Sequence, residues 1–270
     1  MANINAFNFL RWDDGTGRNP TDLPQAYIRD RCQNEFMPII VPGENIAFYI
    51  NTRYGYDYGA APSLRLLKFG EAVWAGSPLQ KDQINVTNYN LYADFAIPAL
   101  TDGIYQFQVL NNGGAPVLTS NYVYCMNEDY ENISSYVEFT NDQNLYNVRY
   151  ASLTNFYQKF RLRITDGDGG TYEPNTESYR SETSGRYRDL LANVQKSYTF
   201  DCYYFDKDAI EATACFLAYR TRIINEKEYA FKEGITNAPI TTSKVVKASF
   251  QMYDQSFSTI NKCTETAASS

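Results

Sequence analysis

The chain has 270 residues, of which 44% are hydrophobic and 16% aromatic, and its formal net charge is −7. It contains no histidine, which excludes a Ser-His-Asp triad, a Cys-His pair and imidazole metal ligands. The acidic charge, with no run of more than two basic residues, argues against a face that grips phosphate backbones. We therefore expect a protein that is not an enzyme, needs no cofactor or metal, and does not bind nucleic acid sequence-specifically.

The sequence has no segment that predicts export or membrane insertion. No stretch approaches the roughly 18 apolar residues needed to cross a bilayer, and the first residues lack the basic and apolar regions of a signal peptide. We therefore expect synthesis in a cytoplasm and no membrane partner. The cysteines are far apart and form no CxxC pair, which predicts free, buried thiols; they are Cys32, Cys125, Cys202, Cys215 and Cys263.

Residues 1–35 contain several turn signals, among them Asp13-Asp14-Gly15 and Asn19-Pro20. They predict an extended arm with little regular structure. Such an arm is ordered when it lies on a neighbour, so we expect this segment to contact another subunit.

Residues 36–128 are expected to form a β-sandwich. Short segments with alternating apolar residues recur every 8–12 residues, separated by turns, as is typical of that fold. Asn111-Asn112-Gly113-Gly114 predicts a hairpin between the last two segments. The predicted strands are 44–50, 63–69, 89–97, 104–110 and 117–125.

The acidic and polar stretch 126–132 interrupts the apolar pattern, and we place a domain boundary there. Residues 129–270 are expected to form a second, α+β domain with one main helix near 208–220, because Ile210, Ala214 and Leu217 lie at helical spacing, and an extended C-terminal tail. The strands expected here are 136–139, 145–150, 196–205 and 244–253, with a turn at 166–170 and a polar loop at 172–184.

Three tyrosines at alternate positions form the main candidate contact site. On a strand, Tyr54, Tyr56 and Tyr58 would share one face. Such a row packs on its own sheet, contacts a protein partner or stacks on sugars.

Asp166-Gly167-Asp168-Gly169 lacks the later ligands of a calcium loop, so it predicts a turn.

Part of the second half resembles structural tail, neck or ring proteins of crAss-like bacteriophages that infect Bacteroidetes. The similarity covers about residues 136–225 and is carried by aromatic motifs without catalytic residues. These are Tyr136-Val137-Glu138-Phe139, Asn144-Leu145-Tyr146-Asn147-Val148-Arg149-Tyr150, Phe156-Tyr157-Gln158-Lys159-Phe160-Arg161-Leu162 and Tyr198-Thr199-Phe200-Asp201-Cys202-Tyr203-Tyr204. The resemblance implies a virion protein that is repeated around a symmetry axis.

We therefore expect many copies in a ring or collar of a phage tail or neck, bound to one another and to other virion proteins. The arm 1–35 and the tail 258–270 would lie on neighbouring subunits, and an acidic lumen would let DNA pass without sticking. A glycan- or receptor-binding module that uses the three tyrosines is the alternative. A glycosidase with a close pair of carboxylates is a third hypothesis, although no sequence motif selects such a pair.

Overall fold

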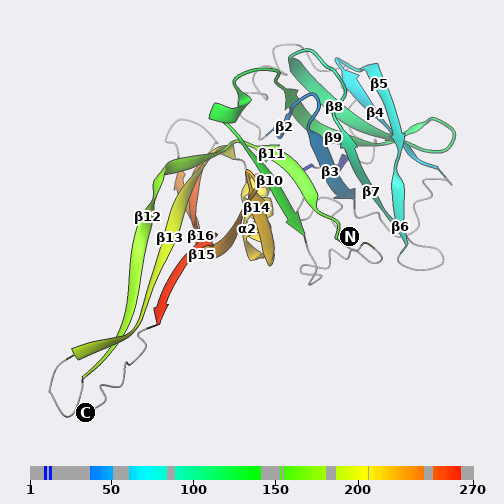
Figure 1. Cartoon of the computed structure of the whole chain (residues 1–270). Helices are drawn as coiled ribbons and strands as arrows, with labels where there is room; N and C mark the ends of the chain where they lie inside the picture. The colour runs from blue at the N-terminus through cyan, green and yellow to red at the C-terminus, as the bar shows by residue number, and fades with distance from the viewer. Residues whose placement is uncertain are drawn as a thin grey trace.

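The computed structural model describes residues 9–10, 12–13, 37–50, 61–83, 89–140, 153, 155–180, 187–205, 207–239 and 246–262. In this part of the chain nearly all regular structure is β-strand, with one main α-helix (Figure 1). The predicted mainly-β fold class with a single main helix is thus confirmed.

The alternating segments of the first half form strands close to the expected positions. They bury the aromatic and aliphatic side chains of one face, as alternation predicts. The strands are β3 (Asn45–Ile50), β4 (Ser63–Lys68), β7 (Tyr89–Ala96), β8 (Gly103–Leu110) and β9 (Pro116–Cys125). Four more strands carry no clear sequence signal: β1 (Trp12–Asp13), β2 (Ile39–Ile40), β5 (Glu71–Pro78) and β6 (Gln80–Gln83).

Two branches of the sheet in this half face each other and enclose a core. One branch runs β2-β9-β8-β4-β5, and the other runs β3-β7-β6. Phe48 of β3 and Phe95 of β7 lie 5.8 and 6.2 Å from the ring of Phe107 on β8. This contact between the inner faces gives the sandwich-like packing expected for these residues.

The second half joins the first through shared strands. It begins after the short 3-10 helix η2 (Tyr130–Asn132) with β10 (Ser135–Thr140), β11 (Gln158–Leu162) and, later, β14 (Thr221–Ile224). β11 pairs with β10, β2 and β3. Hydrogen bonds therefore continue across the predicted boundary at residues 128 and 129.

The helix α2 (Lys207–Ala218) covers the core of this half. Phe139 on β10 lies 5.4 Å from the ring of Phe216 in the helix and 5.6 Å from that of Tyr219 just after it. Phe9 lies 5.9 Å from Phe139. The predicted helix near 208–220 is confirmed to within one residue at its start and two at its end.

Four long antiparallel strands complete the second half, in the order β12-β13-β16-β15. They are β12 (Ile164–Arg180), β13 (Tyr187–Phe205), β15 (Lys227–Pro239) and β16 (Val246–Lys262). β15 pairs with β16 only as far as Tyr229 and Asp254, whereas the other three strands continue. We call residues 173–180, 187–195 and 255–262 the limb, which extends away from the rest of the molecule (Figure 1).

Two predictions about this region are wrong. The expected turn 166–170 lies within β12, where the pairing with β13 shifts between Gly167 and Thr171. Glycines suit such a bulge as well as they suit a turn. The expected loop 172–184 is strand as far as Arg180, because the limb satisfies its backbone by pairing even where its sequence is polar.

The predicted arm and tail are described only in part. Within residues 1–35, Phe9, Leu10 and Trp12 are buried in the chain's own core, and Trp12–Asp13 pairs with β9. Within the tail 258–270, residues 258–262 belong to β16 and pair with β13. The predicted strand 145–150 lies outside the described residues.

Candidate functional site

A polar cavity of about 670 Å³ lies where the two halves meet. Four segments that are distant in sequence form its walls: the turn into β3, the stretch from η2 to β10, the strand β11, and the turn between β14 and β15. Its lining residues are Gly43, Glu44, Asn45, Glu131, Ser134, Tyr136, Arg161, Asn225 and Glu226.

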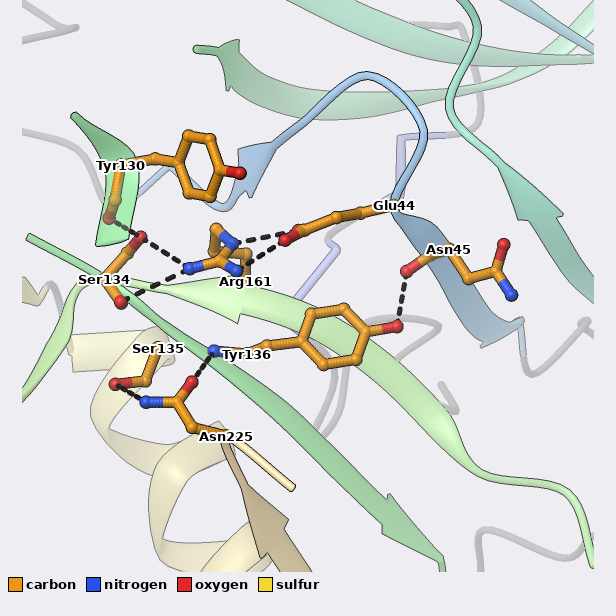
Figure 2. A network of polar contacts seen from close by, with 8 residues as sticks. All are labelled: Glu44, Asn45, Tyr130, Ser134, Ser135, Tyr136, Arg161 and Asn225. Carbon is orange, nitrogen blue, oxygen red and sulfur yellow. Dashed lines mark hydrogen bonds and ion pairs between the residues drawn. The ribbon is translucent and has the colours of Figure 1, made fainter. Parts of the chain in front are cut away.

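A buried arginine organises this cavity (Figure 2). The side chain of Arg161 on β11 is 9% exposed, and it forms a bidentate ion pair with Glu44. Its Nε donates to Glu44 Oε2 at 2.9 Å and its Nη2 donates to Oε1 at 2.5 Å. Its Nη1 donates to the carbonyl and hydroxyl oxygens of Ser134 at 3.4 and 3.3 Å. This planar fork is the geometry in which arginine binds carboxylates most strongly.

Two tyrosine rings flank the guanidinium. Its carbon lies 4.6 Å from the ring centre of Tyr130 and 6.0 Å from that of Tyr136, within the range of cation–π attraction. Tyr136 donates its hydroxyl hydrogen to the carbonyl of Asn45 at 2.7 Å. Burial, aided by Glu138, Glu44 and Asp94, raises the pKa of Tyr136 well above its usual value. The phenol therefore stays protonated and acts as a donor.

Asn225 ties the turn between β14 and β15 to the same site. Its Oδ1 accepts the backbone N–H of Tyr136 at 2.8 Å, and its Nδ2 donates to Ser135 Oγ at 3.2 Å. The backbone N–H of Asn225 donates to the carbonyl of Tyr136 at 2.8 Å, and Ser135 donates to the carbonyl of Ile164 at 2.7 Å. The cavity walls are thus linked from the start of β3 to the start of β12.

We call this network the polar joint, because its contacts tie segments of the two halves together; its residues are Glu44, Ser134, Tyr136, Arg161 and Asn225. Both oxygens of Glu44 are occupied by Arg161, so a role as a base would require breaking the ion pair. The carboxylates of Glu131 and Glu226 leave the cavity with an acidic balance. Among the described residues, no group of three or more Cys, Asp or Glu side chains is placed to hold a metal ion.

A second polar cluster crosses the four long strands where the limb begins. Glu173 of β12 forms an ion pair with Lys232 of β15. Between them lie Ser197 of β13, which donates to Glu173 Oε1 at 2.8 Å, and Tyr253 of β16, which donates to Oε2 at 3.3 Å. The hydrogen bonds from Lys232 and Ser197 lower the pKa of Glu173. Together these contacts hold all four strands in register at the root of the limb.

The structure describes some of the residues that the sequence analysis singled out and leaves others undescribed. Tyr54, Tyr56 and Tyr58 lie outside the described residues. Cys125, Cys202 and Cys215 are free and buried, as predicted. The ion pair of Arg161 with Glu44 was not predicted, because its partners lie 117 positions apart and no local motif links them. Within the described residues, no helix is long and apolar enough to span a bilayer.

Comparisons with known proteins give no further identification. No family model, no curated protein and no solved structure shows a significant match to the chain.

Proposed function

We propose that this chain is a structural protein of a virion, present in many copies in a closed ring or collar of a phage tail or neck. The limb is the observation that carries the proposal. The limb is formed by the far ends of β12, β13 and β16, strands that contain 17, 19 and 17 residues, about three times the usual strand length. At about 3.3 Å per residue, each spans roughly 55–65 Å.

A ribbon of this kind gains stability from contact with another molecule. Folding a strand orders its backbone at a cost of about 1–2 kcal/mol per residue. A ribbon of three strands is stable on its own only when it has an apolar face to pack. A limb that lies along a neighbouring subunit or virion component would bury its faces and strengthen the assembly.

The composition of the chain supports the same assignment. The chain has 24 tyrosines, a residue enriched at protein interfaces because its ring is apolar and its tip is polar. The acidic charge of −7 suits a ring through which DNA passes. The virion context of the proposal comes from the aromatic motifs within residues 136–225, which resemble those of crAss-like phage tail, neck and ring proteins.

The test is the mass of the purified chain with and without the limb. In the shortened variant, Asn-Gly replaces residues 175–193 and the chain ends at Ser256. Pro174 and Val194 are paired neighbours, so the new turn closes the ribbon without shifting its register. We expect the full chain to form one closed species by mass photometry and electron microscopy, and the variant to remain a monomer.

The melting temperature of the shortened variant serves as the control for folding. A value within a few degrees of the full chain would show that the core is intact. A full chain that stays monomeric at high concentration, or that is present as a single copy in virions, would refute the proposal. A shortened variant that still assembles at normal yield would show that the limb is not the connecting element.

A further inference from the structure

Three of the five highly exposed large hydrophobic residues in the described part of the chain lie at the two ends of the sheet. The described large hydrophobic residues with high exposure are Phe69, Val73, Ile133, Tyr172 and Phe231. Val73 lies on β5, the last strand of the sheet order, and Phe69 lies in the turn before it; Tyr172 lies on β12, the first strand. Figure 1 shows these terminal strands on opposite sides of the molecule.

Phe69 occupies a position that its own turn does not favour. It has a φ of +53° and precedes Gly70 at +85°, in a two-residue hairpin turn between β4 and β5. Asn, Asp and Gly are preferred there, because a bulky side chain in the left-handed region is strained. The ring is nevertheless 68% exposed, so the chain itself offers little packing that would offset this strain. Such local conflicts concentrate at functional positions.

The turn is held in place by its neighbour Lys68. The Lys68 ammonium donates to Thr101 Oγ1 at 2.7 Å and to the carbonyl of Asp102 at 3.2 Å, and it lies 5.0 Å from the ring centre of Tyr105. These contacts fix the hairpin against the loop between β7 and β8. Phe69 is therefore presented on a pre-organised support, which lowers the entropy lost on binding.

The two ends carry complementary charge beside their apolar groups. Glu71, which is exposed, lies two residues from both Phe69 and Val73. At the other end, the ring of Tyr172 is 57% exposed, and the Lys196 ammonium lies between two rings, 5.5 Å from the centre of Tyr172 and 4.6 Å from that of Tyr198. Lys68 and Glu173 beside these rings are engaged within the chain, which leaves Glu71 at one end and Lys196 at the other as the charges that could pair between copies.

We propose that the β4–β5 hairpin of one copy docks on the limb root of the next copy, with Phe69 and Val73 against Tyr172 and with Glu71 beside Lys196. This inference rests on the proposed multi-copy ring and names a contact that acts together with the limb, because the limb-shortened variant keeps both Tyr172 and Lys196. A head-to-tail contact between two different surfaces is what generates a ring. A rigid aromatic side chain at its centre is the usual energetic anchor of such an interface.

The decisive variant is Phe69→Asn. Asparagine fits the left-handed turn better than phenylalanine does, so the melting temperature should stay the same or rise. Removal of a central aromatic anchor should weaken association by at least about 30-fold, measured as the concentration dependence of mass. Ile133→Asn is the matched control, because Ile133 is 40% exposed but lies at neither end; it should assemble as the wild type does.

Charge reversal identifies the partner surface. Glu71→Lys and Lys196→Glu should each weaken assembly, and the double variant should restore it. If Phe69→Asn assembles normally while the wild type forms rings, this contact is refuted and the ring remains. If Phe69→Asn loses only its binding to another virion protein, the second copy is not the occupant. A monomeric wild type would refute both proposals.

Discussion

Glu44→Gln should destabilise the fold more than a surface substitution does, because it leaves the buried guanidinium of Arg161 without its counter-charge. The substitution preserves size and keeps one acceptor oxygen. It removes the negative charge from an ion pair whose arginine side chain is 9% exposed and whose glutamate side chain is 27% exposed.

The magnitude follows from this partial burial. Breaking a fully buried pair costs about 3–5 kcal/mol, and an exposed pair contributes about 0–1 kcal/mol. With one partner buried and the other reached by solvent, we expect a loss of about 2–3 kcal/mol. For a chain of this size, about 2–4 °C of melting temperature corresponds to each kcal/mol, so the melting temperature should fall by roughly 5–10 °C.

Arg161→Met should be less harmful than Glu44→Gln. It leaves the unpaired charge on Glu44, which water can reach, and replaces the guanidinium stem with an apolar chain of similar length. We expect a cost of about 1–2 kcal/mol, chiefly from the lost hydrogen bonds to Ser134. Because both single changes remove the same ion pair, the double variant should resemble Arg161→Met, with a coupling energy of about 2 kcal/mol.

Thermal unfolding followed by the fluorescence of the two tryptophans measures these effects. Glu131→Gln is the matched control, since Glu131 lines the same cavity and is exposed; it should change stability by less than about 0.5 kcal/mol. A Glu44→Gln variant as stable as the Glu131→Gln control would contradict the argument that this ion pair holds the two halves together.

Three further outcomes are expected. Hydrogen bonds from Lys232 and Ser197 lower the pKa of Glu173 in the folded protein. The ionised Glu173 carboxylate therefore stabilises the fold above about pH 4.3, and this contribution is lost as the pH falls through the lower folded pKa. The melting temperatures of wild type and Glu173→Gln should differ above that pH and converge in acid. Phe139→Ala removes a ring that contacts four other aromatic rings and should cost about 3–5 kcal/mol by the same thermal assay. Burial raises the pKa of Cys125 to about 11 and raises that of Cys202 further, so mass spectrometry should find both thiols unmodified by maleimide at pH 8 and labelled after denaturation.

Local patterns predict the first half well because the same residues set both the strand and its turn. Residues 111–114 show this directly. Asn111 Oδ1 accepts the backbone N–H groups of Gly113 and Ala115 at 3.0 and 2.9 Å, and Gly114 has a φ of +78°. The chemistry that marks a hairpin in sequence is the chemistry that closes it in the fold.

The limb and the polar joint could not be predicted in this way. Alternation identifies a strand by one apolar face, and the polar sequence of residues 172–180 shows no such alternation, so it resembles the sequence of a loop. The glycines of residues 166–170 fit both a turn and a bulge, and pairing with β13 decides between them. The joint depends on segments up to 117 residues apart, whose approach follows only from the pairing of β11 with β2 and β3.

The pairing of β11 with β2 and β3 also means that part of the sheet can form only late in synthesis. β2 lies between β9 and β11 in the sheet, and β11 ends at Leu162, 37 residues after β9 ends at Cys125. At about 5–20 residues per second, the ribosome needs roughly 2–7 s to make those residues. During that interval the nascent sandwich exposes the edges of β2 and β3 that β11 later covers, which makes this the stage at which a chaperone or a stray strand has access to it.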